Sequence, residues 1–546
     1  MRVRFAIVIS ILVLAYSYLL FNLYRIQVLN NTNYLARAES QYAASGVLKA
    51  PRGGIFFTDK EGNSLPAVLN KDFPVIYAVP KVIGDASETS NLLAPILGIP
   101  VEELNKKLSK KEDLYEILAK KASSEILSKV KDLKIKGIYT DIESDRFYPF
   151  GPLMAQVLGF VAPDKNSDGE SGRYGLESYY EKSLSGKAGE TDSGKIIAPK
   201  KGEDLNLTID PNIQIEVQKI INRLVTTFKA KGGSIIVEDP KTGKILAMES
   251  LPSFDPNNYG KFNLESFLNP TIQTIFEPGS VFKVITMAAG LDAGKITPDT
   301  TYVDTGVLKV SGREIKNWDL KAHGKLTMAN VLEQSVNTGA AFAERQTGHV
   351  LFRSYLDKFG FSEKTGVDLP GELSGDIKRL KPGAPEVAFA TASFGQGVAI
   401  TQLEIINAFS AIANGGHLMR PYINNTIEPI EIRRVISANS AKLVTDMMIS
   451  AVDKAGVGHI KGYSLAGKTG TAQIPDFKKG GYVPNEVIDT YIGFGPTTDS
   501  KFVILIKLDE PEGAPLAGVT VVPAFRDLAQ FIINYYNIPP DRINSN

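Results

Sequence analysis

The sequence predicts an α+β fold for its C-terminal part, with helices on the faces of a mainly antiparallel sheet. Strand-like runs come in adjacent pairs, at residues 233–250 and at residues 491–508, and such pairs form antiparallel hairpins. Helical stretches lie between these pairs but do not alternate with single strands, as they would in a parallel βαβ fold. A last amphipathic stretch, over residues 522–536, predicts a terminal helix.

Length and composition limit the classes of protein that the chain can represent. Its 546 residues imply at least two domains, and 43% hydrophobic with 22% charged residues is ordinary for a globular chain. The net charge of +1, without a basic block, argues against nucleic acid as a partner. The absence of cysteine excludes disulfides, thiol catalysis and zinc–thiolate sites, and the four histidines have no metal-ligand spacing. We therefore expect no metal and no cofactor.

The N-terminal segment predicts a transmembrane helix. Residues 5–24 contain no charged side chain, and as a helix they would span about 30 Å, the hydrocarbon thickness of a bilayer. Tyrosines gather towards the end of this run, where amphipathic rings suit the membrane interface. A cleaved signal peptide is the alternative, but the apolar run is long for one. With residues 1–4 as a cytoplasmic tail, everything functional would lie beyond the helix.

Residues 25–204 predict a separate, non-catalytic domain. Leucine and isoleucine alternate with lysine and glutamate over residues 101–135 at helical spacing, which predicts exposed helices. Residues 190–203 are polar and rich in glycine and lysine, typical of a linker or a surface hairpin. The pattern then changes to an alternating strand, so we place the catalytic domain at residues 205–546.

A Ser-x-x-Lys motif carries the first chemistry in the sequence. Ser280 follows a Pro-Gly turn at the start of an apolar-periodic helix, and Lys283 projects from the same face three residues later. A serine hydroxyl needs a base within hydrogen-bond reach. A lysine is that base only if burial or a neighbouring cation lowers its pKa. The backbone N–H of Ser280, at the helix start, can stabilise a developing oxyanion.

Two later motifs indicate that the Ser-x-x-Lys motif at Ser280 is not a chance match. A second Ser-x-x-Lys, at residues 128–131, lies in a lysine-rich stretch typical of a solvated helix face. The copy at Ser280 is followed by Ser335-Val336-Asn337 and then by Lys468-Thr469-Gly470-Thr471. The ordered set S-x-x-K, S-D-N and K-T-G is known from penicillin-binding proteins and class A β-lactamases.

Context also decides among the K-T-G copies. Residues 241–243 lie between two strand-like runs and predict a hairpin turn, and residues 364–366 lie in a loop rich in glycine and proline. Lys468 instead leads into a strand, where Gly467 and Gly470 would let a ligand or another backbone approach closely. We expect the only tryptophan, Trp318, to serve packing or a cleft wall rather than chemistry.

The chain resembles the class B penicillin-binding proteins, which are monofunctional peptidoglycan D,D-transpeptidases. The resemblance covers most of residues 205–540 and extends more weakly over residues 40–205. Glu277 before the Pro-Gly turn, and Ser393-Phe394 before Gly395-Gln396-Gly397, are more similar to the division and sporulation branch than to the elongation branch. The resemblance implies a transpeptidase domain with the serine between an antiparallel sheet and a helical cluster. It also implies an elongated pedestal, or dimerisation-like, domain before it.

The resemblance also implies a role for each motif residue. Lys283 takes the proton of Ser280, which attacks the penultimate D-alanine carbonyl of a stem peptide and releases the terminal D-alanine. The backbone N–H groups of Ser280 and Thr471 form the oxyanion hole. The remaining roles are proton transfer to the leaving amine by Ser335, orientation by Asn337, positive charge from Lys468, and carboxylate binding along Thr469, Gly470 and Thr471.

Several alternatives stay open or are disfavoured. A D,D-carboxypeptidase or an elongation-type transpeptidase would use the same residues, whereas the E-x-x-L-N segment of class A β-lactamases is missing between Ser280 and Lys468. Val336 replaces the aspartate of the S-D-N motif, where the family tolerates variation. Ser335 and Thr471 also have simpler, purely structural interpretations. Ser335 would cap a helix, and Thr471 would be an ordinary strand residue. A complete catalytic set disfavours a non-enzymatic divisome scaffold.

The same reasoning predicts partners and location. A bifunctional enzyme would carry a glycosyltransferase signature with a histidine upstream, but the first histidine is His323. We therefore expect a membrane glycosyltransferase partner of the shape, elongation, division and sporulation group, acting on lipid-linked nascent glycan. The expected substrates are peptidoglycan stem peptides, with β-lactams as inhibitors. The expected location is the bacterial plasma membrane, with the catalytic domain on its outer face.

Overall fold

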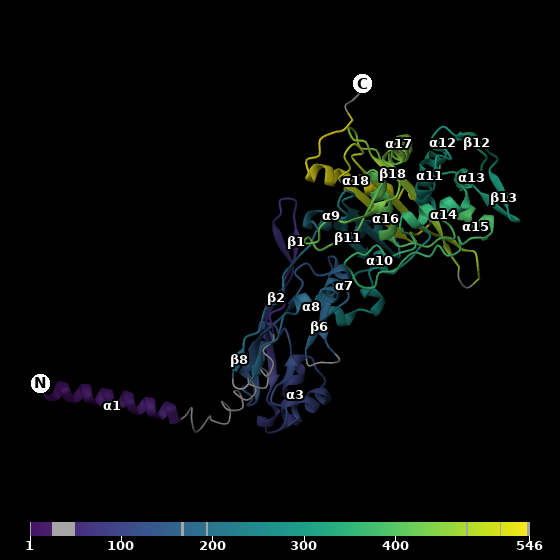
Figure 1. The fold of residues 1–546 in the computed structure, drawn as a ribbon. Helices are drawn as coiled ribbons and strands as arrows, with labels where there is room; N and C mark the ends of the chain where they lie inside the picture. The colour runs from purple at the N-terminus through teal and green to yellow at the C-terminus, as the bar shows by residue number, and fades with distance from the viewer. Residues whose placement is uncertain are drawn as a thin grey trace. The chain divides into compact units, whose positions relative to one another are not determined.

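The computed structural model describes residues 2–24, 50–164, 169–192, 195–476, 479–513 and 515–542 (Figure 1). The chain divides into two compact units. The first comprises Met1–Gly53, Leu69–Phe147 and Ser185–Glu203, and the second comprises Gly54–Val68, Tyr148–Leu184 and Asp204–Asn546. The longest strand, β2 (Ser64–Ala78), therefore contributes to both units.

The N-terminal element is the helix α1 (Arg2–Tyr24). A search of the described residues identified no helix with the length and apolarity needed to cross a membrane. The transmembrane span over residues 5–24 stays a prediction.

Beyond α1, the first unit combines a small antiparallel sheet with short helices. β2 pairs with β3 (Glu116–Ala119) and β4 (Ile138–Phe147). The short helices are η2 (Pro80–Val82), α3 (Ala86–Leu97), α4 (Val101–Leu108) and α5 (Ser124–Asp132). Of the two interpretations of residues 190–203, a linker or a hairpin, the hairpin is confirmed by the pairing of β7 (Glu190–Asp192) with β8 (Lys195–Ile197). The expectation of helices throughout residues 101–135 was wrong at β3. Leu118 there is buried in the core, because its strand pairs with β2, a partner distant in sequence.

The second unit contains a short N-terminal group of elements. β1 (Ile55–Thr58) pairs antiparallel with the first part of β2 and parallel with β9 (Leu205–Asn206). The remaining elements of this group are β5 (Phe160–Pro163), β6 (Glu170–Arg173), α6 (Ala155–Leu158), α7 (Gly175–Tyr179) and α8 (Glu181–Leu184).

A five-stranded antiparallel sheet forms the centre of the second unit. Its strand order is β11-β10-β20-β19-β18. The strands are β10 (Gly232–Glu238), β11 (Ile245–Leu251), β18 (Ala466–Pro475), β19 (Tyr482–Gly495) and β20 (Phe502–Asp509). Both predicted strand pairs are present as antiparallel pairs, β10–β11 and β19–β20, and residues 241–243 form the turn between the first two. The predicted α+β class is confirmed.

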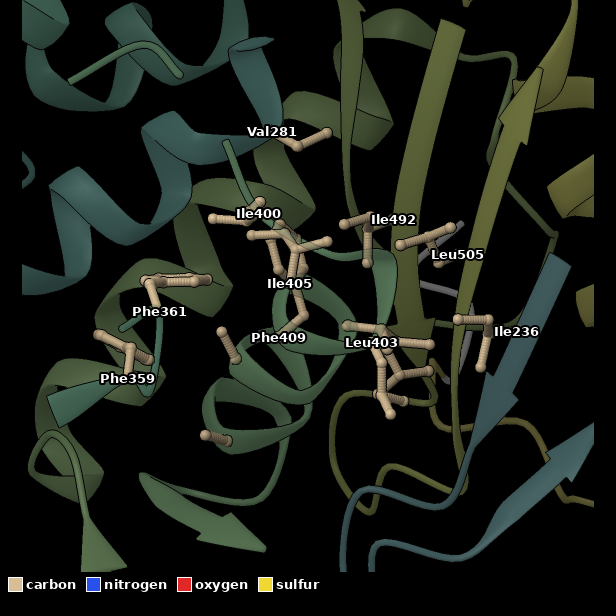
Figure 2. Close-up of a cluster of buried hydrophobic side chains, with 14 of the residues drawn as sticks. Ile236, Val281, Phe359, Phe361, Ile400, Leu403, Ile405, Phe409, Ile492 and Leu505 are labelled. Carbon is tan, nitrogen blue, oxygen red and sulfur yellow. The ribbon is translucent and has the colours of Figure 1, made fainter. Parts of the chain in front are cut away.

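Strand alternation gives the sheet two apolar faces. Ile235 and Val237 belong to one core with α9 (Pro211–Thr227) and the C-terminal helix α18 (Val521–Tyr535). Ile236, one residue out of phase, faces the opposite side, because successive strand side chains point to opposite faces. There it packs with α16 (Gln402–Ala413), as Figure 2 shows for the sheet residues and for Leu403.

Helices and small hairpins surround this second face. The helical elements are η3 (Pro256–Lys261), η4 (Leu264–Phe267), α10 (Pro270–Gln273), η5 (Gly279–Phe282), α11 (Lys283–Asp292), α12 (Met328–Glu333), α13 (Asn337–Thr347), α14 (His349–Lys358), α15 (Glu386–Ala392) and α17 (Ala438–Ala455). The hairpins or strand pairs are β12 (Thr301–Asp304) with β15 (Gly324–Thr327), β13 (Val307–Val310) with β14 (Arg313–Lys316), and β16 (His417–Met419) with β17 (Glu431–Arg434).

Candidate active site

Ser280 lies in a single 3₁₀ turn at the start of a buried helix. η5 leads directly into α11, whose side chains from Lys283 to Leu291 are buried. Gly279, with φ +59°, makes the preceding turn in a conformation that favours glycine. The expectation that Ser280 occupies the first turn of a helix is confirmed. The buried helix fixes the half-buried serine at the edge of the core.

Lys283 lies within hydrogen-bond reach of two serines. Its Nζ is 3.0 Å from Ser280 Oγ, 3.2 Å from Ser335 Oγ and 2.5 Å from the Ser335 carbonyl oxygen. The lysine is fully buried, and this burial, together with the charge of Lys468, holds its pKa well below the usual range. A neutral amine can donate its two hydrogens to Ser335 and direct its lone pair at the Ser280 hydroxyl.

Ser335 connects the two lysines. It lies between α12 and α13 with φ +57°, a left-handed conformation that is uncommon outside glycine. Lys468 Nζ donates to Ser335 Oγ over 3.0 Å, so one hydroxyl contacts both amines. A helix cap on α13 is not its role, because the residue at the N-cap is Val336.

Lys468 reaches the site from β18, which is the last strand in the sheet order. Its side chain is 4% exposed, and burial lowers its pKa to about 7. Its Nζ also donates to the Thr469 carbonyl over 3.0 Å. The expected close approach to this strand occurs at Gly470, where a Cβ atom would lie 3.1 Å from the Pro278 carbonyl oxygen. A side chain at position 470 would therefore press on the turn that carries Ser280.

Two predicted site residues, Asn337 and Thr471, are hydrogen-bonded to other segments of the protein. The Asn337 amide donates to the Lys316 carbonyl over 2.9 Å, not to Lys283. The Thr471 hydroxyl donates to Asp489 over 3.0 Å and accepts from the Ala517 N–H over 3.1 Å. The two side chains are thus held by residues of other segments, Lys316 of β14 for Asn337, and Asp489 of β19 with Ala517 for Thr471. The motif spacing does not specify the positions of these segments.

Residues on either side of the serine turn support the site. The Glu277 carboxylate accepts from the Gly397 N–H (2.8 Å) and from the Tyr482 hydroxyl (3.1 Å). Burial raises the pKa of Glu277, although these hydrogen bonds oppose the rise. Gly395 faces the turn so closely that a Cβ atom would lie 2.2 Å from the Gly279 carbonyl oxygen. The Gly-Gln-Gly pattern marks this segment in the sequence, but nothing there connects it with the serine turn.

The described part of the chain holds no cluster of three or more histidine, cysteine, aspartate or glutamate side chains arranged for a metal ion. The chemistry available at the site is that of hydroxyls, amines and backbone N–H groups. A buried, neutral amine beside a serine at a helix start suits acyl transfer through a covalent serine intermediate.

Comparison with known proteins agrees with this geometry. The penicillin binding protein transpeptidase domain family matches residues 233–530, and the penicillin-binding protein dimerisation domain family matches residues 47–207. Stage V sporulation protein D of Bacillus subtilis is 34% identical over 491 residues, covering 84% of this chain and 75% of that protein. Peptidoglycan D,D-transpeptidase FtsI of Escherichia coli is 30% identical over 567 residues, covering 99% of this chain and 93% of that protein.

A solved structure extends the likeness to the fold. Penicillin binding protein 3 of Mycobacterium tuberculosis, in complex with aztreonam, is 25% identical with a TM-score of 0.69, covering 91% of this chain and 98% of that chain. The chain belongs to the penicillin-binding protein family, with a dimerisation domain followed by a transpeptidase domain. Within the family it is a class B protein, as the motifs led us to expect.

Proposed function

We propose that this chain cross-links peptidoglycan stem peptides through an acyl-enzyme on Ser280. The chain is a serine-type D,D-transpeptidase. One observation carries the assignment of the serine: Lys283 Nζ is 3.0 Å from Ser280 Oγ, buried and with a lowered pKa. In that state the lysine is a base rather than a cation.

The first half-reaction acylates the serine. Lys283 accepts the Ser280 proton while Oγ forms a bond to the carbonyl carbon of the penultimate D-alanine. The developing oxyanion is stabilised by the backbone N–H groups of Ser280 and Thr471, an arrangement that typically contributes several kcal/mol. The C–N bond to the terminal D-alanine then breaks, and Ser335, in contact with both lysines, passes a proton to the leaving amine.

The second half-reaction transfers the acyl group. An amine on a neighbouring stem peptide attacks the ester carbonyl and loses its proton to Lys283. Lys283 returns this proton to Ser280 Oγ as the ester C–O bond breaks, which forms the cross-link and regenerates the serine. Lys468, with Thr469, Gly470 and Thr471 along β18, binds the carboxylate of the donor. The Thr471 hydroxyl hydrogen, which is directed at Asp489, must turn away from Asp489 to donate to that carboxylate. Asn337 borders the site and orients the substrate amide.

The serine assignment predicts the outcome of labelling with a fluorescent penicillin. A β-lactam acylates the same nucleophile, so Ser280→Ala should abolish labelling at wild-type thermal stability. The matched control is Ser128→Ala, which removes the serine of the other Ser-x-x-Lys copy, on α5, and should label like the wild type. Labelling of Ser280→Ala at the wild-type rate would refute the nucleophile. Release of D-alanine coupled to incorporation of an amine acceptor then measures transpeptidation.

The cellular setting is part of the same proposal. α1 anchors the chain in the bacterial plasma membrane with the catalytic domain outside, and residues 1–4 form a cytoplasmic tail. Support comes from the described side chains of α1, of which Leu14 is 70% and Tyr16 65% exposed. The pedestal domain comprises residues 25–204 and the transpeptidase domain residues 205–546. A membrane glycosyltransferase supplies the nascent glycan, and the similarity to a stage V sporulation protein supports a division or sporulation role.

A further inference from the structure

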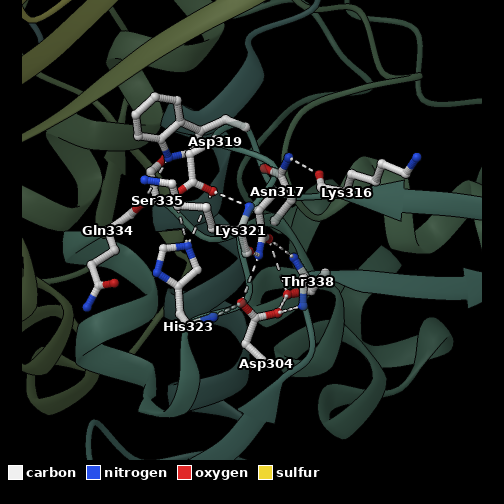
Figure 3. Close-up of polar contacts among 12 residues, drawn as sticks. Asp304, Lys316, Asn317, Asp319, Lys321, His323, Gln334, Ser335 and Thr338 are labelled. Carbon is white, nitrogen blue, oxygen red and sulfur yellow. Dashed lines mark hydrogen bonds and ion pairs between the residues drawn. The ribbon is translucent and has the colours of Figure 1, made fainter.

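A buried carboxylate lies behind the Ser335 turn and has no part in the chemistry above. Asp304, the last residue of β12, is 2% exposed. One of its oxygens accepts from the Thr338 hydroxyl (2.7 Å) and the Gly306 N–H (2.9 Å). The other accepts from the Asn317 amide (2.8 Å) and the His323 N–H (2.9 Å), as the dashed lines in Figure 3 show. Burial alone would raise the pKa of Asp304, but these hydrogen bonds, led by that of Thr338, lower it.

Asn317 forms a second set of hydrogen bonds that fixes Thr338. Its side-chain oxygen accepts from the Thr338 backbone N–H over 3.3 Å, and its amide nitrogen donates to the Lys321 carbonyl over 3.0 Å. Thr338 is thus fixed through its hydroxyl by Asp304 and through its backbone by Asn317. It follows Asn337 directly, at the start of α13.

The same segment also holds the other end of the Ser335 turn. The Trp318 indole N–H donates to the Gln334 carbonyl over 3.2 Å, and the Asn337 amide donates to the Lys316 carbonyl over 2.9 Å. The residues on both sides of Ser335 are therefore bound to residues 304–323 (Figure 3). A left-handed, non-glycine residue persists only where its surroundings determine it, and these bonds supply that constraint.

We propose that Asp304 is a positioning residue for Ser335, acting through Thr338 and Asn317. The role rests on the proposed function of Ser335 in proton transfer. Ser335 Oγ must stay within hydrogen-bond range of both amines, at 3.0 Å from Lys468 and 3.2 Å from Lys283. Such bonds weaken steeply with distance and angle, so a small shift of the turn separates the hydroxyl from one lysine or the other.

Thr338→Val tests the proposal with the least damage to the fold. The variant keeps the shape of the side chain but removes the hydroxyl that Asp304 holds, and we expect acylation by a penicillin to slow by about tenfold. Thr338→Ser keeps the hydroxyl and should restore most of the rate. The matched control is Thr347→Val on the same helix, whose buried hydroxyl donates to the Ala343 carbonyl away from the turn. It should lower the melting temperature without slowing acylation of the folded protein.

A double variant separates positioning from a general structural effect. If Thr338 acts through Ser335, adding Thr338→Val to Ser335→Ala should slow acylation no further, because the hydroxyl to be positioned is already absent. Independent, multiplying losses in the two variants would overturn the proposal. A rate of acylation of Thr338→Val within twofold of the wild-type rate would also overturn the proposal. If Ser280→Ala is unlabelled in the same experiment, the proposed function still stands. Labelling of Ser280→Ala would instead overturn the proposed function itself.

Discussion

At the scale of single residues, the site depends on two amines buried close together. Lys283 is fully buried, Lys468 is 4% exposed, and both contact one serine hydroxyl. Burial disfavours the charged form of a lysine, and a charge on one further disfavours a charge on the other. We therefore expect Lys283 to act as a base, although a lysine is ordinarily a cation at neutral pH.

This arrangement predicts a pH dependence of acylation. Lys283 must be neutral, so the rate constant for penicillin acylation should fall as pH is lowered through the Lys283 pKa. Below pH about 7, Lys468 carries its proton and repels a second charge on Lys283. Lys468→Met removes that repulsion, and we expect the acid limb of its pH profile to move to higher pH, in addition to a slower rate. An acid limb that stays in place would show that the two amines are not coupled.

A second prediction concerns a buried carboxyl outside the site. Glu238, at the end of β10, is fully buried, and burial raises its pKa from 4.5 to about 8. Because the folded protein holds a proton that the unfolded chain loses, stability should fall as pH rises from about 4.5 to 8. Glu238→Gln replaces the carboxyl group with a neutral amide that does not titrate.

The stability of Glu238→Gln relative to the wild type should therefore be greater at pH 8 than at pH 5. Melting temperatures at the two pH values measure the difference. The exposed Glu265→Gln serves as the control and should leave the difference near zero. An equal effect of Glu238→Gln at both pH values would contradict the protonated state.

At the scale of elements, the active site is a meeting of three segments with little space between them. The serine turn η5 packs against the edge strand β18, where Gly470 allows the approach. On another side it meets the Gly-Gln-Gly segment: the Gly279 N–H donates to the Gly395 carbonyl over 3.1 Å. Small residues at these contacts let backbone lie against backbone, which rigidly fixes the direction of the Ser280 hydroxyl.

Gly395→Ala should therefore impair catalysis more than a surface glycine substitution. Its φ is +79°, and the new Cβ would lie 2.2 Å from the Gly279 carbonyl oxygen, so the serine turn must move. A displacement of about 1 Å at a reacting group can reduce the rate about a hundredfold, and we expect a loss of that order in penicillin acylation. Gly383→Ala is the matched control, since its φ is also +79° but its Cβ would meet nothing within 4 Å. Equal losses in the two variants would point to backbone strain alone.

At the scale of the whole molecule, the two compact units have separate apolar cores. Leu93, Leu104 and Leu118 belong to a core of the first unit, whereas the sheet and helices of the second unit enclose their own. Every residue of the proposed chemistry lies in the second unit. Acylation should therefore not require α1.

This independence predicts how a shortened chain behaves. A protein beginning at residue 50 should react with a fluorescent penicillin at a rate within about twofold of the full chain in detergent, because the acylation site lies far along the sequence. If α1 is the membrane anchor, the full chain should sediment with lipid vesicles and the shortened chain should not. Co-sedimentation of both proteins would contradict the assignment of α1 as the anchor, and loss of labelling would contradict the independence.

Much of the fold and the reactive groups could be predicted because the signals are local. Alternation and turn residues predicted β10–β11 and β19–β20, and the periodicity of residues 522–536 predicted α18. Leu118 was misassigned, since its spacing suits a helix while its strand is formed by pairing with β2. Local patterns do not report such distant pairing.

The sequence by itself determined the family of the chain and the candidates for its chemistry: a serine and a lysine one helical turn apart, and two later motifs in a fixed order. Only the tertiary structure decided how these groups are arranged. It placed Ser335 between two buried amines, directed the hydroxyl of Thr471 towards Asp489, and set Asp304 behind the Ser335 turn. The physical reason is that burial and hydrogen-bond direction depend on segments distant in sequence. Burial, together with the charge of Lys468, is what lowers the pKa of Lys283.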